Sequence, residues 1–362
     1  TPAPTADGRA CFITDGGQLH CIDSKGMTLY TDSDFSLGAD HAYDIATCGT
    51  GFAIAYYEDV VLFDGASFDR LPVELPEEAF GVDNVTCDSG GKNIAVSASG
   101  GFVFLRQGDT WQTFNMAEQD RDDDPDYTSV TDVALLDDGT LWVAMTNNLA
   151  FWDGSTWHVF EKGTDWEVSP YFSALAASPD GNMYASYDGG VMRYDGKLTL
   201  LENSEAGGAY AMQVTADRIL AGHGFGAFVL DLEGKTVVSY GAGDREDLPF
   251  AATIYGIALD GEGRLWLSST WGLQVVDADG VFQTYRMNNT DMTSSELDGL
   301  AIQGTPPLPP VVNHPAGSIT GIVLKDGQPV ADAEVVACTI DMGFETPCSG
   351  DPTYVSSQTD AK

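Results

Sequence analysis

Basic residues are scarce in this sequence: 16 Lys and Arg stand against 55 Asp and Glu in 362 residues, a formal net charge of −39. Nucleic-acid binding needs a basic stripe that neutralises phosphates, so nucleic acid is excluded as a partner. Hairpin turns use much of the Asp, but they do not require so little lysine. The surplus favours a high-salt, divalent-rich or outer-surface environment, or cationic partners, and it fits a solubility-tuned secreted protein equally well.

Long apolar runs are also lacking. No stretch approaches the roughly 18 apolar residues that a membrane helix needs, so we expect the chain as given to be soluble. The Thr/Pro/Ala-rich start is typical of a processed N-terminus or of a spacer after a lipid-anchored cysteine. We therefore interpret residues 1–8 as a spacer and expect an extracellular or cell-surface location, with peripheral or lipid-anchored membrane association as one form of it.

Catalytic motifs are missing. No Gly-x-Ser-x-Gly turn, metal-binding histidine pair or phosphate-cradling glycine loop occurs. The histidines are scattered over the chain at His20, His41, His158, His223 and His314. The sequence therefore predicts no catalytic residues, and a candidate calcium ion is the one cofactor it indicates.

What the chain does contain is a segment of about forty residues that recurs seven times. Each copy opens on an apolar anchor, and the steps between anchors are 40, 48, 42, 37, 45 and 43 residues. The anchors are Ile45, Val85, Val133, Leu175, Met212, Ile257 and Leu300. Short alternating strands at this period predict a β-propeller.

Each copy has the pattern of a four-stranded meander. A polar turn such as Asp137-Asp138-Gly139 follows the anchor, a second strand such as "LWVAMT" comes next, and two further strands flank another glycine turn, as in "FWDGSTWHVF". Strands separated by such turns form antiparallel hairpins. We therefore expect one blade per copy, with strands A to D in chain order.

The two ends of the repeat region complement each other. The first copy starts at its second strand, and "ELDGLAIQG" at 296–304 is a first strand with nothing after it. An open ring would leave one strand edge unpaired. We predict an all-β fold with a seven-bladed propeller at residues 9–304, closed by a C-terminal strand that completes blade 1.

The copies resemble the two-component-regulator propeller repeat. Copies four and seven match it best, through Leu141-Trp142 with Thr146 and Leu149, and through Leu265-Trp266 with Thr270 and Gly272-Leu273. Tyr184 replaces the Trp in the fifth copy, and the second, third and sixth lack it. The resemblance covers about 300 residues and implies a fold rather than a function, because such propellers occur in glycan sensors, surface proteins and lipoproteins.

A proline-rich stretch at 305–316 is typical of a semi-rigid linker. Residues 317–362 resemble the opening of a carboxypeptidase-regulatory-like β-sandwich, through strands at 318–324 and 333–337, the turn Asp326-Gly327, and Pro329. Such a domain continues further, so we expect either that the chain is part of a longer protein or that a neighbouring copy supplies the remaining strands by self-assembly.

The six cysteines pair once the propeller register is accepted. Cys11 and Cys21 face each other across a hairpin, Cys48 and Cys87 end the first strands of blades 2 and 3, and Cys338 and Cys348 bridge a loop in the C-terminal module. Three disulfides predict an oxidising compartment. The alternative is six reduced, buried thiols; a zinc site is disfavoured, because no Cys-x-x-Cys spacing exists.

One acidic segment, in the connection between blades 3 and 4, is a candidate calcium site. Its hard oxygen ligands would be Asp122, Asp123, Asp124 and Asp126, a donor type that Ca²⁺ prefers. The order lacks the alternating Asp pattern of a dedicated calcium loop, so a plain solvated acidic loop is the alternative.

Propeller ligands commonly enter at the face that carries the D-to-A connections and the B-to-C turns, and several aromatic residues fall there. The predicted channel-mouth residues are Tyr43, Tyr57, Tyr127, Trp166, Tyr171, Tyr187, Tyr210, His223, Phe225, Tyr255 and Trp271. Aromatic faces beside carboxylates suit sugar rings or a cationic group. Packing at the mouth is the alternative for each residue.

The function these features favour is a secreted or cell-surface, non-enzymatic binding or scaffold protein, whose partner is an extracellular protein or a glycan. One alternative is an extracellular glycan sensor, as the repeat family implies. The other is a lyase or hydrolase acting on polysaccharide, since "GHGFG" at 222–226 is similar to histidine turns of streptogramin-lyase propellers, although no second histidine with a supporting acid can be identified.

Overall fold

The computed structural model describes residues 8–31, 34, 42–119, 129–160, 171–201, 206–241, 252–312, 324–325, 328–329, 334–337 and 355–358. The chain divides into two compact units, Thr1–Val311 and Val312–Lys362. Each unit is described by itself.

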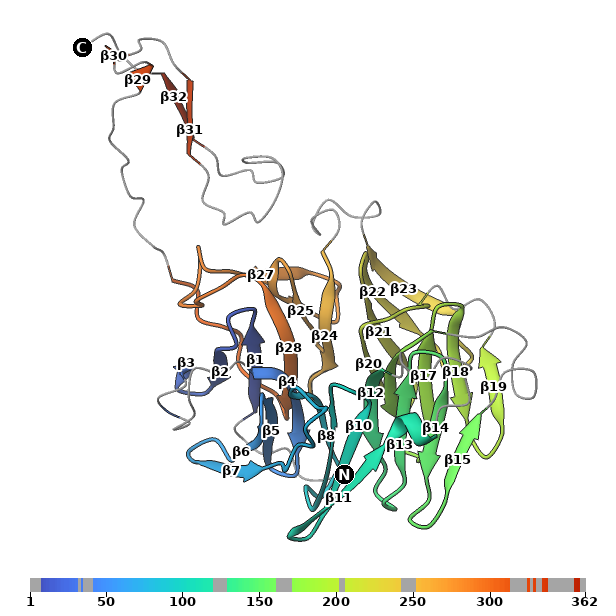
Figure 1. Ribbon diagram of the computed structural model, residues 1–362. Coiled ribbons are helices and arrows are strands. Elements are labelled where there is room, and N and C mark those ends of the chain that lie inside the picture. The colour runs from blue at the N-terminus through green and yellow to red at the C-terminus, as the bar shows by residue number, and fades with distance from the viewer. Residues whose placement is uncertain are drawn as a thin grey trace. The chain divides into compact units, whose positions relative to one another are not determined.

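The first unit is a seven-bladed β-propeller, as predicted. Its strands form seven four-stranded antiparallel sheets, and Figure 1 shows them side by side. The first strands of neighbouring blades contact one another all the way round, including the pair formed by the last and the first blade. The ring is therefore closed, and these strands are the innermost.

The blades have the A-to-D strand order that the repeat predicts. Blades 2 to 4 comprise β4 (Ala42–Cys48), β5 (Gly51–Tyr56), β6 (Asp59–Phe63) and β7 (Phe68–Pro72); β8 (Val82–Cys87), β9 (Asn93–Ala98), β10 (Phe102–Gln107) and β11 (Thr110–Asn115); and β12 (Val130–Leu135), β13 (Leu141–Met145), β14 (Leu149–Trp152) and β15 (Trp157–Phe160). Blades 5 to 7 comprise β16 (Phe172–Ala177), β17 (Met183–Tyr187), β18 (Gly190–Tyr194) and β19 (Leu198–Leu201); β20 (Ala211–Val214), β21 (Ile219–His223), β22 (Gly226–Leu230) and β23 (Thr236–Gly241); and β24 (Ile254–Leu259), β25 (Leu265–Ser269), β26 (Gly272–Val276) and β27 (Phe282–Tyr285).

Blade 1 joins the two ends of the propeller chain. Its order is β28 (Leu297–Gln303), β1 (Arg9–Thr14), β2 (Leu19–Asp23) and β3 (Gly26–Tyr30). In the antiparallel register of β1 with β28, Phe12 lies opposite Leu300, and the blue and orange arrows lie together in Figure 1. The predicted closure of blade 1 by a C-terminal strand is confirmed.

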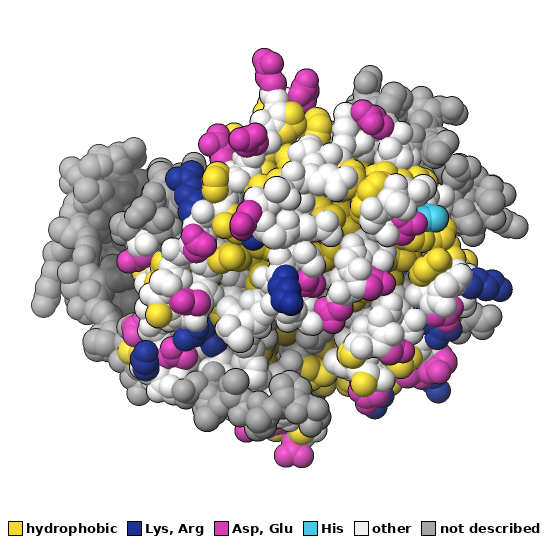
Figure 2. All heavy atoms as spheres, turned by 90° about the horizontal axis from the view of Figure 1, so that it is seen from below, with side chains coloured by type: hydrophobic (Ala, Val, Ile, Leu, Met, Phe, Trp, Pro, Cys, Tyr) yellow, Lys and Arg dark blue, Asp and Glu magenta, His cyan; other side chains and the backbone are white. Residues whose placement is uncertain are grey.

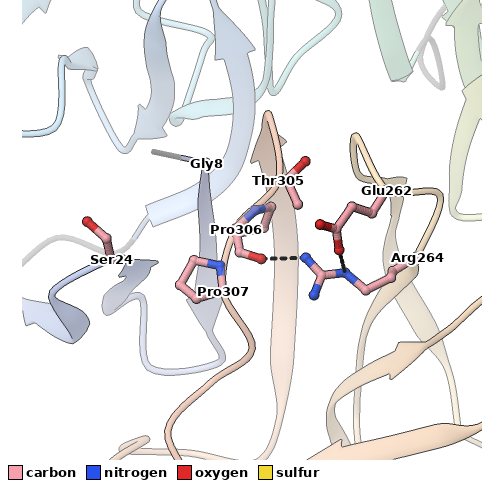
Figure 3. Close-up of a pocket in the computed structure, with 7 residues that line it drawn as sticks. All are labelled: Gly8, Ser24, Glu262, Arg264, Thr305, Pro306 and Pro307. Carbon is pink, nitrogen blue, oxygen red and sulfur yellow. Dashed lines mark hydrogen bonds and ion pairs between the residues drawn. The ribbon is translucent and has the colours of Figure 1, made fainter. Parts of the chain in front are cut away.

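Hydrogen bonds from Arg264 hold the chain that follows β28 against blade 7. The Arg264 guanidinium donates a hydrogen bond of 2.5 Å to the carbonyl of Pro306 and one of 2.6 Å to the Asp260 carboxylate. Figure 3 shows Arg264, Glu262 and Pro306 around a cavity of about 260 Å³ that Gly8 and Ser24 also line. Because Arg264 is already paired with Asp260 and Pro306, we interpret this cavity as part of the closure seam.

Burial within a blade follows strand position. The second strands β5 and β13 are buried at every residue, whereas the outer strand β7 is mostly exposed. Neighbouring blades cover both faces of a middle strand, so continuous apolar runs such as "LWVAM" fit there. The core therefore lies between blades, in clusters that each draw on two adjacent sheets.

Two predicted disulfides are confirmed. Cys11 and Cys21 are bonded across the β1–β2 hairpin, and Cys48 and Cys87 join β4 of blade 2 to β8 of blade 3. The third predicted pair, Cys338 and Cys348, lies outside the described residues.

Helix is nearly absent from the part of the chain that the structure describes. The 3₁₀ helix η1 (Met116–Glu118) follows blade 3. No helix among the described residues has the length and apolar character needed to cross a membrane.

The second unit contains two small sheets among its described residues. They pair β29 (Leu324–Lys325) with β30 (Gln328–Pro329), and β31 (Glu334–Ala337) with β32 (Val355–Gln358). β31 falls within the strand predicted at 333–337. Two hairpins do not establish a sandwich, so the carboxypeptidase-regulatory-like assignment of 317–362 and the linker boundaries stay predictions.

Candidate functional site

The D-to-A connections and the B-to-C turns share one face of the propeller, and backbone hydrogen bonds tie them together. The amide of Val82 donates to the carbonyl of Tyr57 at 2.9 Å, and the amide of Thr270 donates to the carbonyl of Thr253 at 3.1 Å. The two kinds of connection thus form one surface around the end of the central channel. We call this surface the mouth.

A β-bulge recurs where the innermost strands begin at the mouth. In six of the seven, the register with the second strand skips one residue. The skipped residues are Tyr43, Asp83, Thr131, Ser173, Tyr255 and Asp298. A bulge leaves its extra residue unpaired and re-aims the side chain. The repeat therefore places variable aromatic, acidic and hydroxyl side chains at the same height around the mouth.

Four of the predicted mouth residues come together in one aromatic cluster. The ring centroids of Tyr210 and Tyr255 are 5.9 Å apart, those of Tyr210 and His223 are 6.4 Å apart, and those of His223 and Phe225 are 5.4 Å apart. Phe225 and Tyr210 are 64% and 56% exposed, and Tyr255 is 37% exposed. Large aromatic faces open to solvent at a cavity rim are available to a ligand.

Carboxylates border this aromatic cluster on the side of blade 1. Burial raises the pKa of Asp298, and the nearby charges of Asp15 and Glu296 raise it further. Burial, Asp298 and Glu296 together raise the pKa of Tyr255 above its ordinary value. The cluster therefore lies in a negative local potential.

Below the aromatic rim the central channel holds a cavity of about 170 Å³. All seven innermost strands, or the residue directly before one, contribute to its lining. The residues that line it are Asp44, Asn84, Thr131, Asp132, Ser173, Leu175, Tyr210, Ala211, Met212, Tyr255, Gly256, Ile257, Gly299 and Leu300. Because Tyr210 and Tyr255 line it too, the cavity opens directly at the aromatic cluster.

Two carboxylates in this cavity connect neighbouring blades. Asp44 accepts hydrogen bonds from the amides of Ile45 and of Val85 in the next blade, and Asp132 does the same with Val133 and Leu175. Burial raises the pKa of Asp44 to about 6 despite these hydrogen bonds. The pKa of Asp132 rises to about 7, because burial is reinforced by the charge of Asp44.

Hydroxyl groups complete the polar lining. The side-chain oxygens of Thr131 and Ser173 are buried and have no hydrogen-bond partner. The side-chain amide of Asn84 donates to the Ser97 hydroxyl at 2.8 Å. The residues that line the cavity therefore include carboxylate, hydroxyl and amide side chains.

The other predicted mouth residues that are described lie apart from the cluster. Tyr57 lies against Gly81, Tyr187 packs on Phe172 with ring centroids 6.5 Å apart, and the Arg286 guanidinium lies 4.3 Å from the centroid of the Trp271 ring. Tyr43 and Tyr171 are exposed on their own blades.

Six predicted site residues cannot be placed. Tyr127, Trp166 and the candidate calcium ligands Asp122, Asp123, Asp124 and Asp126 lie outside the described residues. Within the described part of the chain, no group of three or more His, Cys, Asp or Glu side chains is arranged to hold a metal ion. The calcium site stays a prediction.

The channel carboxylates were missed by the sequence reasoning, although a signal existed. Asp44 and Asp132 each directly precede a repeat anchor, where an otherwise apolar strand has no reason to carry a charge. Comparing that position across the copies gives Asp, Asn and Asp in blades 2 to 4 and Ala or Gly in the others. A charged residue at a position that holds Ala or Gly in other copies marks a place where the fold needs or tolerates charge.

Among the described residues, one histidine lies at the mouth. His223 belongs to the aromatic cluster, and its Nδ1 is buried without a hydrogen-bond partner. His20 is buried inside blade 1, where its Nε2 lies 2.8 Å from the Thr293 hydroxyl and burial lowers its pKa to about 4. His158 pairs with Asp153 on an outer strand.

No protein-family model matches the chain, and neither does any curated protein. Solved structures do match it in fold. A catalytically inactive virginiamycin B lyase from Staphylococcus aureus, solved with quinupristin, is 12% identical with a TM-score of 0.54, over 71% of this chain and 86% of that one. YCF48 bound to D1 peptide is 12% identical with a TM-score of 0.51, over 72% of this chain and 86% of that one.

A third similar structure is an extracellular one. It is the extracellular domain described for the hybrid two-component system BT4673 from B. thetaiotaomicron, 15% identical with a TM-score of 0.51, over 71% of this chain and 35% of that one. This chain thus spans about a third of the length of that extracellular domain. At such identities the likeness is one of fold, and function has to be argued from the site.

Proposed function

We propose that this protein is a secreted or cell-surface binding module, without catalytic activity, whose propeller takes a ligand at the mouth. The observation that carries the proposal is the solvent-open aromatic cluster of Tyr210, Tyr255, His223 and Phe225 at the rim of the channel cavity. Aromatic anchors around a concave site with a few polar groups are typical of ligand binding.

The proposed location rests on the disulfides and on one similar structure. Two disulfides link positions within and between blades, and such bonds persist in oxidising compartments. The extracellular domain of BT4673 has the same fold. Both favour a position outside the cytoplasm for the propeller.

Binding is favoured over catalysis by the composition of the mouth. A catalytic histidine is typically oriented by a hydrogen bond at its second ring nitrogen, and His223 Nδ1 has no such partner among the described residues. The fold likeness to virginiamycin B lyase keeps a propeller lyase as the second candidate. A sensor module for glycans would use the same mouth as the binding module.

The test is a binding screen of the full chain against a glycan array and a peptide array. We expect ligands whose signal is lost in Tyr210→Ala/Tyr255→Ala and kept in Leu200→Ala. Leu200 is a large apolar residue, 53% exposed on the outer strand β19 and away from the mouth. Binding that ignores the double substitution, or binding to nothing on either array, would contradict the proposal. Turnover of a bound glycan would favour the lyase instead.

A further inference from the structure

We propose that the channel cavity is a site for an organic cation, an alkylammonium or guanidinium group that enters past Tyr210 and Tyr255 and ends at Asp44 and Asp132. The inference rests on the proposed function, since it uses the same mouth, and it names the ligand chemistry. Its source is either the side chain of a lysine or arginine in a partner protein or a free amine.

The first argument is uncompensated charge. Asp44 and Asp132 line the cavity, and none of the described residues that line it with them is Lys or Arg. Burial raises the pKa of both groups and the charge of Asp44 raises that of Asp132 further; backbone hydrogen bonds oppose the rise, and no cation contributes to either. A buried carboxylate without a counter-charge is costly, so a cation placed between the two would be strongly favoured.

The second argument is the neighbouring rim. Asp83 in blade 3 and Asp298 in blade 1 stand at the bulge positions of the mouth and also lack a nearby cation among the groups that affect them. The negative potential thus extends from the rim to the carboxylates inside. Such a lining attracts and orients cations as they approach. On the face drawn in Figure 2, acidic side chains are likewise spread widely and basic ones are fewer.

Size points to a side-chain-sized group. The cavity of about 170 Å³ is smaller than the roughly 300 Å³ at which sites for drug-sized ligands begin. A metal ion is disfavoured, because no three ligating side chains converge among the described residues. A cation with an alkyl stem fills such a space better than a bare ion does.

Aromatic faces at the entrance fit the same ligand. Tyr210 and Tyr255 line the cavity itself, and the negative face of an aromatic ring attracts ammonium and guanidinium groups. The mouth already contains one such contact, because Arg286 lies 4.3 Å from the Trp271 ring centroid. Cation–π contact at the rim and carboxylates inside would therefore act on one ligand together.

Two hydroxyl residues stand beside the carboxylates in the cavity lining. The oxygens of Thr131 and Ser173 have no hydrogen-bond partner, although both residues line the cavity. An ammonium group has three N–H donors and a guanidinium five. The carboxylates of Asp44 and Asp132 would accept from some of these donors, and a side-chain rotation that turns the Thr131 or Ser173 hydroxyl into the cavity would add another acceptor. A neutral apolar ligand has no donor for any of these oxygens.

The decisive experiment is calorimetric titration of the full chain at pH 8 and low salt with matched probes. The probes are the N-acetylated, C-amidated peptide Gly-Ser-Lys-Ser-Gly, the same capped peptide with norleucine in place of lysine, and 1,5-diaminopentane. We expect the lysine peptide to bind at least tenfold more tightly than the norleucine peptide. Binding of the diamine as well would identify the amine itself as sufficient; binding of the peptide alone would identify a protein side chain as the source.

Variants assign the binding to the channel. Asp44→Asn/Asp132→Asn should weaken binding of the lysine peptide at least tenfold. The control Asp279→Asn changes an exposed residue in the outer turn of blade 7 and should alter the affinity less than twofold. Should the double variant fail to fold, the comparison of lysine with norleucine on the unaltered protein decides alone.

The outcomes separate this inference from the proposed function. Equal binding of lysine and norleucine peptides, no binding of any probe, or an unchanged double Asn variant would overturn the cation site. A neutral ligand that depends on Tyr210 and Tyr255 but not on Asp44 and Asp132 would leave the binding module standing without it. Ligands whose binding depends neither on Tyr210 and Tyr255 nor on Asp44 and Asp132 would contradict both the cation site and the proposed function.

Discussion

The carboxylate of Asp44 in blade 2 accepts a hydrogen bond of 2.9 Å from the backbone amide of Val85 in blade 3. The innermost strand of a propeller blade has one edge without a strand partner, so its amides facing the channel need other acceptors. A side chain reaching across from the preceding blade supplies one. The same contact therefore satisfies an amide and fixes one blade against the next.

This bridge recurs at alternate blade junctions. Asp132 of blade 4 accepts from the amide of Leu175 in blade 5 at 2.6 Å, and Gln213 of blade 6 accepts from the amide of Leu259 in blade 7 at 2.8 Å. Two of the three bridges use a charged acceptor and one a neutral acceptor. The neutral bridge shows that the fold itself does not require charge in the channel.

The neutral bridge provides a test of what such contacts contribute to stability. We expect Gln213→Leu to lower the free energy of unfolding by about 1–3 kcal/mol, because the Leu259 amide loses its acceptor. Urea unfolding followed by tryptophan fluorescence measures the change. Gln112→Leu on the exposed outer strand β11 is the matched control and should stay within about 0.5 kcal/mol. Equal effects at both positions would show that the bridge contributes nothing.

The two charged bridges predict that stability depends on pH. An unfolded Asp has a pKa of about 3.9, whereas the folded values are about 6 for Asp44 and about 7 for Asp132. The folded state therefore binds these protons more tightly, and the stabilisation is present at low pH and lost as pH rises through 6 to 7. Between pH 8 and pH 5 the two groups should add roughly 4 kcal/mol.

One histidine acts in the opposite direction. Burial lowers the pKa of His20 to about 4, so the unfolded chain takes up this proton first as pH falls below 6.5, which removes roughly 2 kcal/mol by pH 5. The measurement is therefore the difference in melting temperature between the unaltered protein and Asp44→Asn/Asp132→Asn at pH 8 and at pH 5. The gain that comes from Asp44 and Asp132 should be missing from the double variant, so between pH 8 and pH 5 its stability should rise by roughly 4 kcal/mol less than that of the unaltered protein; parallel curves would refute the buried-carboxylate interpretation.

The disulfides should differ in their effect on stability. Cys48–Cys87 closes a separation of 39 residues and Cys11–Cys21 one of 10, and loop-closure entropy predicts about 4 and about 3 kcal/mol respectively. The Cys11→Ala/Cys21→Ala variant keeps Cys48–Cys87, so the difference in its free energy of unfolding between oxidised and reduced protein reports on the longer loop. The Cys48→Ala/Cys87→Ala variant keeps Cys11–Cys21 and reports on the shorter loop in the same way. Packing effects of the Ala residues cancel within each comparison. A larger loss for the shorter loop would contradict the entropic account.

Much of the fold could be predicted from the sequence, because a propeller is specified by local patterns that repeat. The spacing of the anchors gave the blades, and the missing first strand at the N-terminus matched the extra one around Leu300, which pairs with Phe12 as expected. Cys48 and Cys87 could be paired because the ends of adjacent innermost strands lie close together. Each of these inferences needs the repeat and no knowledge of side-chain packing.

The site was harder to predict from the sequence than the fold, for a physical reason. Tyr210, His223 and Phe225 belong to strand ends and a turn of blade 6, and Tyr255 joins them from the bulge of blade 7. Asp44 and Asp132 become notable only when the next blade is seen to supply their hydrogen-bond donors. Contacts across blades depend on the ring as a whole, and a single copy of the repeat does not specify them.

Two equivalent tryptophans show how the copies diverge. In blade 7 the indole Nε1 of Trp266 donates to the Asp260 carboxylate at 2.9 Å, and Arg264 donates to the same carboxylate. In blade 4 the indole Nε1 of Trp142 is buried and has no hydrogen-bond partner. The residues at the positions of Asp260 and Arg264 are there Leu136 and Thr140, so the acceptor and its counter-charge are both absent.

Introducing the equivalents of Asp260 and Arg264 into blade 4 should therefore recreate the hydrogen-bond network of blade 7 only when both substitutions are made together. Leu136→Asp alone places an uncompensated carboxylate at a partly buried position and should destabilise the protein by about 3 kcal/mol or more, whereas Thr140→Arg alone should change little. Together they should recover at least about 1 kcal/mol relative to the sum of the single effects. Leu136 and Thr140 both line a cavity of about 190 Å³ between blades 4 and 5, which leaves room for the longer arginine. Urea unfolding of the four proteins measures the coupling, and strict additivity would mean that blade 4 cannot adopt the arrangement of blade 7.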